Sequence, residues 1–288
     1  MPPLFPLTLV LYAATCVLCF VALAQPRLGG RRLILPLLGG GLLSQGADVA
    51  WLCLHGQSPG SSAREALYLV SFLILILLGL RSYRQPLPLL GAMVIPGTLI
   101  LMVLVRALPR PQAATTFPFS SLGTTRLAVL HIFSATLGIA LFGIAAATSV
   151  AYLLSERRLK QQRLPSLDAA VQEPSLRTLD AWNRQGTVFG LLAFTAALVS
   201  GTHWLLESQP TSARLDAPEL GTQVRYLLSQ PRYTLSVMTW LLFSGLLVAR
   251  TVFGLRGRWV PQLTLVGFWT SLGVLGVYLF RDVVGLRP

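Results

Sequence analysis

The stretch LAVLHIFSATLGIALFGIAAATSVAYLL, residues 127–154, decides the fold class of this chain. It contains no Asp, Glu, Lys or Arg. A helix rises about 1.5 Å per residue, so a helix of this length crosses the ~30 Å hydrocarbon core of a bilayer. In lipid the helix is the favoured form, because each backbone N–H then finds its partner within the segment. The stretch therefore predicts a transmembrane helix.

Similar apolar runs recur along the whole chain of 288 residues. Hydrophobic residues make up 53% of it and charged residues only 11%, against about 25% in soluble domains. These values exclude a soluble enzyme domain, a disordered chain and a disulfide scaffold. We predict an all-α membrane protein, a single polytopic domain over residues 1–288 that forms a bundle of eight transmembrane helices. The predicted helices cover about residues 4–24, 33–55, 65–80, 87–107, 127–154, 184–206, 233–253 and 259–281.

The basic residues predict the orientation of the bundle. The chain has 23 Lys and Arg against 10 Asp and Glu, a net charge of +13. They stand singly or in small groups at the ends of apolar runs, which is typical of topology signals and excludes a nucleic-acid-binding face. The loops after the first, third, fifth and seventh runs carry the larger share of them. We therefore expect these loops in the cytoplasm and both termini outside (N-out and C-out).

The three histidines are the first candidates for chemistry. With this orientation His55, His131 and His203 all fall at the outer boundary of the membrane. Neutral imidazole is a good ligand for haem iron and for other metals. The alternative is a histidine that only anchors a helix end at the interface. His203 is followed by Trp204, which also belongs to ordinary interfacial belts.

Asp48 lies inside the second predicted helix, with Gln45 about one turn earlier. A carboxylate at the centre of a bilayer costs ~2.5–3.5 kcal/mol on insertion scales. Asp48 is therefore expected to face the bundle and to pair with a hydroxyl, an amide or an arginine. Two roles follow from this position, a proton or cation relay and a polar clamp between helices.

The sequence carries no signature of a soluble-type catalytic centre. It has no P-loop, no dinucleotide fingerprint, no HExxH and no GxSxG motif. We therefore expect that the protein is not an enzyme.

Short motifs follow one another through the second half of the chain. They are Leu130-His131-Ile132-Phe133-Ser134, the exit Tyr152–Lys160, Leu179-Asp180, Gly201-Thr202-His203-Trp204, Thr234–Trp240, and a turn with Arg250, Gly254, Arg256 and Gly257. In this order and at these spacings, residues 127–286 resemble the CcsA/HemX-type cytochrome c assembly family. The resemblance is closest to its HemX-like and YpjD-like branch.

The resemblance implies eight helices in a bacterial cytoplasmic (inner) membrane and haem handling at its outer face. In the family, the histidine that matches His131 is an outer-face haem ligand. The implied cofactor is haem b, with His203 or His55 as a possible second ligand. Arg126 and Arg225, near the outer face, could pair with the haem propionates.

The chain also departs from the family pattern. The tryptophan-rich outer signature of haem-exporting members, roughly WGxxWxWD, is missing around Gln223–Tyr226. The second outer histidine would fall near Leu286–Pro288, and the inner one aligns with Val248. Much of the family's haem-ligand set is therefore absent.

Three functions remain open from the sequence. The first is a haem-binding protein of cytochrome c assembly that acts with other maturation proteins. The second is a membrane regulator of tetrapyrrole synthesis, which binds a cytosolic enzyme through the basic inner segment Arg157–Arg184 and needs no haem. The third is a transporter of small solutes or metals that works through Asp48 and Gln45.

Overall fold

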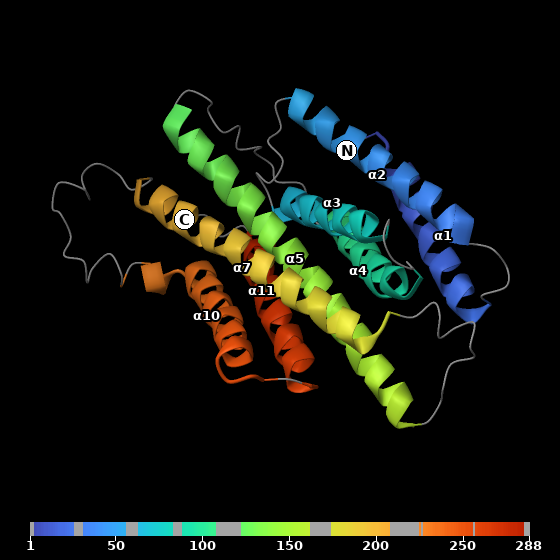
Figure 1. Ribbon diagram of the computed structural model, residues 1–288. Helices are drawn as coiled ribbons and strands as arrows, with labels where there is room; N and C mark the ends of the chain where they lie inside the picture. Colours follow the sequence, from blue (N-terminus) through green and yellow to red (C-terminus); the bar gives the residue numbers. More distant parts are fainter. Residues whose placement is uncertain are drawn as a thin grey trace.

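The structure is a computed structural model that describes residues 3–25, 31–55, 63–82, 88–107, 122–161, 174–207, 225, 227–255 and 257–284. In these ranges the chain is helical and contains no strand (Figure 1). The helices are α1 (Phe5–Ala24), α2 (Arg31–Leu54), α3 (Ala63–Ser82), α4 (Pro88–Ala107), α5 (Leu122–Lys160), α7 (Leu176–Glu207), α10 (Pro231–Thr251) and α11 (Trp259–Val284). Each contains one of the predicted apolar runs, so the prediction of an all-helical membrane protein is confirmed at this level.

Seven of the described helices are long and apolar enough to cross a membrane. The eighth, α3, is not among them. It begins with Arg64 and Glu65 and has Arg81 in its last turn, which shortens its apolar part. The expected count of eight spans is therefore not confirmed, and the N-out, C-out orientation stays a prediction.

The largest difference from the predicted bounds is at the start of α7. The sequence placed this start at Arg184, but the helix begins at Leu176. The hydroxyl of Ser175 accepts a hydrogen bond from the backbone N–H of Thr178 at 3.2 Å, which caps the first turn. Leu179 and Trp182 are buried against the neighbouring helices. Contacts with other helices thus stabilise two turns whose mixed polar sequence looks like a loop.

Helices α5 and α7 form the most extensive contact in the bundle. In Figure 1 they cross the centre of the molecule, with α1 to α4 on one side and α10 and α11 on the other. A Cβ added to Gly186 would lie 3.0 Å from the carbonyl oxygen of Leu141, and one on Gly190 would lie 2.7 Å from the ring of Phe142. The two helices therefore approach each other because glycines face the contact.

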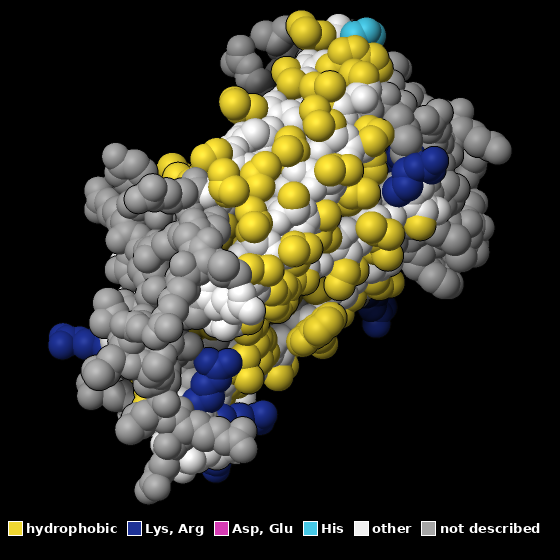
Figure 2. Space-filling view, turned by 90° about the vertical axis from the view of Figure 1, so that its right-hand side faces the viewer, with side chains coloured by type: hydrophobic (Ala, Val, Ile, Leu, Met, Phe, Trp, Pro, Cys, Tyr) yellow, Lys and Arg dark blue, Asp and Glu magenta, His cyan; other side chains and the backbone are white. Residues whose placement is uncertain are grey.

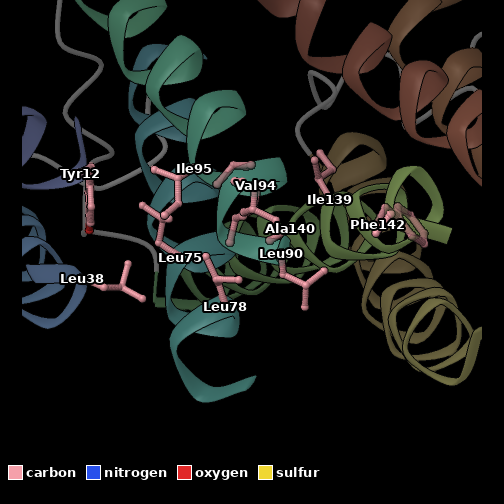
Figure 3. Close-up of a cluster of buried hydrophobic side chains, with 14 of the residues drawn as sticks. Tyr12, Leu38, Leu75, Leu78, Leu90, Val94, Ile95, Ile139, Ala140 and Phe142 are labelled. Atoms are coloured by element: carbon pink, nitrogen blue, oxygen red, sulfur yellow. The ribbon is translucent and has the colours of Figure 1, made fainter. Parts of the chain in front are cut away.

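The core lies where these helices meet α3, α4 and α10, and Figure 3 shows its buried apolar side chains. The ring of Phe142 on α5 stacks on Phe243 of α10, with centroids 3.7 Å apart. Figure 2 shows outward-facing apolar side chains gathered in a broad band along one face of the molecule. On α2, Leu43 and Leu54 are 79% and 85% exposed. An apolar surface of this kind fits contact with lipid.

Candidate functional site

His131 has its ring fixed by a contact between α5 and α7. Its Nδ1 lies 2.7 Å from the backbone carbonyl oxygen of Ala197. A carbonyl oxygen only accepts hydrogen bonds, so Nδ1 carries the proton and donates it. In the neutral imidazole the lone pair is then on Nε2. Histidines that ligate metals commonly donate their other ring N–H to a backbone carbonyl in this way, which sets the tautomer and the direction of the ligating nitrogen.

Gly201, one turn beyond Ala197 on α7, provides the space for this ring. A Cβ at position 201 would lie 2.6 Å from both Cε1 and Nδ1 of His131. A Cβ essentially never comes this close to a non-bonded atom, so the His131 ring can take this place only against glycine. The antiparallel register of α5 and α7 thus places a carbonyl and a glycine opposite His131.

His203 and Trp204 lie at the same end of the bundle as His131, because they follow Gly201 in the last turns of α7. His203 is exposed and Trp204 is half-buried. We refer to this end of the bundle as the His131 end. His203 shares this end of the bundle with His131, but it lies two residues beyond Gly201 and therefore on a different side of α7 from the one that meets the His131 ring.

His55 does not join this pair. It follows the last residue of α2, is exposed, and its Nδ1 lies 2.8 Å from the carbonyl oxygen of Trp51. Its ring also lies over the ring of Trp51, with centroids 4.0 Å apart. The main packing partners of α2 are α1 and α3. His55 is therefore held within its own helix end.

The arginines proposed for the propionates lie partly outside the described residues. The side chain of Arg126, just over one turn before His131, is not described, whereas Arg225 is exposed. The structure adds Arg232, in the first turn of α10, whose charge acts on the His131 ring. Sequence reasoning missed Arg232 because only the packing of α10 beside α7 brings it near α5.

The opposite end of the bundle, which we call the Arg250 end, is held by a polar network that is buried at Asn183 and exposed at Asp180. One guanidinium nitrogen of Arg250 donates to Asn183 Oδ1 at 2.9 Å, and the other donates to Asp180 Oδ1 at 2.5 Å. The amide nitrogen of Asn183 donates to Ser149 Oγ at 2.8 Å and to Thr264 Oγ1 at 3.2 Å. Arg250 therefore links α10 to α7, and Asn183 links α7 to α5 and α11.

Two more motif residues have visible structural roles. The indole N–H of Trp240 donates to Thr195 Oγ1 at 2.9 Å and connects α10 to α7. Gly257 lies in the turn before α11 with φ at +80°, a backbone conformation that residues other than glycine rarely adopt. Arg256, which belongs to the same turn motif as Gly257, lies outside the described residues.

Asp48 lies fully buried among α1, α2 and α3. Its carboxylate accepts the backbone N–H of Leu4 at 2.9 Å and the hydroxyl of Tyr68 at 3.2 Å. Gln45 accepts the hydroxyl of Tyr12 at 2.9 Å and donates to Ser71 Oγ at 3.1 Å. The carboxylate faces the bundle and is paired, as expected from the cost of leaving it in lipid. Within the described ranges, no group of three or more His, Cys, Asp or Glu side chains could hold a metal ion.

A family model described as cytochrome c assembly protein matches residues 61–284, the greater part of the chain. The chain belongs to the cytochrome c assembly protein family. Membership makes it a membrane protein of cytochrome c biogenesis. Comparison with curated proteins and with solved structures finds no match.

The family match starts earlier than the resemblance seen in the sequence. That resemblance began at residue 127, whereas the match includes α3 and α4 as well. These two helices are apolar and contain no short motif, so their residues alone give no sign of the family. The family match thus covers α3 and α4 together with α5 to α11.

Proposed function

We propose that this cytochrome c assembly protein binds haem at the outer face of the membrane, with Nε2 of His131 as axial ligand. The observation that carries the proposal is the 2.7 Å contact between Nδ1 of His131 and the carbonyl oxygen of Ala197. It leaves the lone pair on Nε2 and fixes the direction of the ring. In this proposal the chain binds haem b and catalyses no reaction itself.

The surroundings of His131 fit the chemistry of haem. The macrocycle is apolar, and the turn of α5 that carries His131 also exposes Val129, Leu130 and Phe133, each by more than half. The propionates are anionic, and Arg232 places positive charge near the ring. A bound haem would supply an iron centre at this end of the bundle, and the chain would orient it through His131.

The visible spectrum of the purified protein tests this proposal. The protein is isolated in mild detergent, and spectra are recorded oxidised and reduced, before and after addition of haem. We expect a Soret band in the wild type and its loss in His131→Ala. His55→Ala is the matched control and keeps the band, because His55 is held at a separate helix end. A wild type that stays haem-free after haem is added would refute the proposal.

His203 is the proposed second ligand, since it lies at the same end of the bundle. His203→Ala should then shift the Soret and reduced bands from a six-coordinate to a five-coordinate pattern. An unchanged spectrum would assign the second position to another group, such as a ligand from a partner maturation protein.

A second candidate function rests on the other end of α5. Arg157, Arg158 and Leu159 are exposed near the end of α5, where the basic segment Arg157–Arg184 begins. Such a basic and partly apolar helix end suits an acidic surface on a cytosolic protein. This is the HemX-like alternative, a regulator that binds an enzyme of tetrapyrrole synthesis. It predicts that Arg157→Glu together with Arg158→Glu abolishes capture of that enzyme and leaves the Soret band unchanged.

For Asp48 we propose the role of a clamp between helices rather than that of a transport site. Both carboxylate oxygens already accept hydrogen bonds, from Leu4 and Tyr68. A relay would require one of these bonds to open during each cycle. Loss of solute flux on Asp48→Asn, in a protein that folds normally, would favour the transporter instead.

A further inference from the structure

A cavity of about 520 Å³ lies between α3, α4, α5 and α7, toward the Arg250 end of the bundle. Small-molecule sites commonly have volumes of about 300–1,000 Å³. Its walls are mainly apolar, and Figure 3 shows Leu78, Leu90 and Val94 from this region. The polar groups in the lining are Arg81 and Gln185, together with the indole of Trp182.

Arg81 is held in the cavity wall by an aromatic contact. Its guanidinium carbon lies 4.5 Å from the centroid of the Trp182 ring. Within the described part of the chain, no carboxylate forms an ion pair with Arg81. The indole ring accepts no more than part of the guanidinium's donors, so the N–H groups of Arg81 that do not face the ring stay available to an anion.

The cavity is bordered by exposed apolar side chains. Leu80 and Phe189 contribute to its lining and are 69% and 58% exposed. Arg81 lies in the last turn of α3, next to Leu80, so it stands at the end of the helix's apolar run. A molecule that enters from the bilayer would therefore bring apolar chains to the walls and a polar head to Arg81.

We propose that this cavity binds an anionic phospholipid. Its phosphate would bind Arg81, and one acyl chain would lie along Leu78, Leu90 and Val94. Arginine is well suited to phosphate because its N–H groups can form two parallel hydrogen bonds. The inference goes beyond the proposed function, since neither His131 nor haem takes part in it. The lipid would fix α3 and α4 against α5 and α7.

Native mass spectrometry of the full chain in detergent tests the proposal. Phosphatidylglycerol or phosphatidylcholine is added, and bound lipid is measured for the wild type, Arg81→Gln, Val94→Phe and the control Arg106→Gln. Arg106 is exposed at the far end of α4. Inorganic phosphate is added as a competitor in a separate series, and the unfolding temperature of each variant is recorded.

We expect the wild type to prefer phosphatidylglycerol. Arg81→Gln should reduce that preference about fivefold, the factor that corresponds to ~1 kcal/mol for one basic side chain near anionic lipid. Val94→Phe fills the cavity and should reduce binding of both lipids. Arg106→Gln and inorganic phosphate should leave lipid binding unchanged.

Four results would overturn the proposal. They are an unchanged preference in Arg81→Gln, unchanged binding in Val94→Phe, an equal loss in Arg106→Gln, and displacement of the lipid by phosphate alone. Displacement by haem would likewise show that the cavity is a haem site. The Soret band of each variant is measured in a separate experiment. Failure of the lipid site and failure of the haem proposal can therefore be told apart.

Discussion

Replacing Gly201 by alanine tests the link between helix packing and the orientation of His131. The new methyl carbon would lie 2.6 Å from Cε1 and Nδ1 of the ring. Ordinary carbon contacts lie at about 3.5–4.0 Å, so the ring must move by about 1 Å or α5 and α7 must separate by a similar distance.

The consequence for the ring follows from its hydrogen bond. The distance from Nδ1 to the Ala197 oxygen is 2.7 Å, and a displacement of about 1 Å takes it beyond the range of a hydrogen bond. Loss of the group that orients a metal-ligating histidine commonly lowers metal affinity by about 10–100-fold. We therefore expect Gly201→Ala to weaken haem binding by about 10–100-fold.

The assay is a titration of haem-free protein with haem, followed by the Soret absorbance. Gly245→Ala on α10 is the matched control, because a Cβ there has no atom within 4 Å. An unfolding temperature is measured for both variants, since overpacking between helices typically costs about 1–3 kcal/mol. Reduced affinity in a folded Gly201→Ala protein would support the orientation of His131 by α7.

An affinity for haem in Gly201→Ala within twofold of the wild type would refute the reasoning. The ring of His131 would then tolerate displacement, and its hydrogen bond to Ala197 would have no part in ligation. An equal loss of affinity in Gly245→Ala would also refute it, because that substitution meets no neighbouring atom.

The remaining predictions concern stability and are read by thermal unfolding in detergent. Arg250→Met removes the hydrogen bonds that Arg250 donates to Asn183 and Asp180 on α7 and should destabilise the protein by ~1–3 kcal/mol, whereas Arg106→Met, at an exposed site, should change little. Asp48→Leu should destabilise it by ~1–3 kcal/mol and more than Asp48→Asn, because leucine leaves two buried donors without an acceptor; equal effects of the two would contradict the clamp. Gly257→Ala forces a side chain to a positive φ and should cost ~1–2 kcal/mol, while Gly273→Ala inside α11 meets no atom and should be neutral or stabilising.

Much of the helical layout could be read from the sequence. Apolar runs bounded by Arg, Pro and polar clusters predicted the helices, and most of their ends lie within a few residues of the observed ones. Helix α5 continues beyond the predicted run, through Glu156 to Lys160, and those two side chains form an ion pair at 2.6 Å. The start of α7 was wrong, since burial of Leu179 and Trp182 stabilises turns that their own composition does not favour.

The candidate site was predictable only in part. A histidine at a membrane boundary is visible in the sequence, and the family resemblance singled out His131. The acceptor for its Nδ1 is a backbone carbonyl, which every residue has, so no sequence pattern could point to Ala197. Similarly, the sequence showed that Asp48 needs a partner, but its partners are Leu4, just before α1, and Tyr68 on α3.

By itself, the sequence determined that this protein is a helical membrane protein, roughly where its helices begin and end, and that it resembles cytochrome c assembly proteins. These properties depend on local composition, because each helix satisfies its own backbone in lipid. Only the tertiary structure decided which helix faces which, and with it the ring direction of His131, the pairing of Arg250 with Asn183 and the cavity beside Arg81. Those features depend on the shapes and hydrogen bonds of residues far apart in the chain, which composition does not encode.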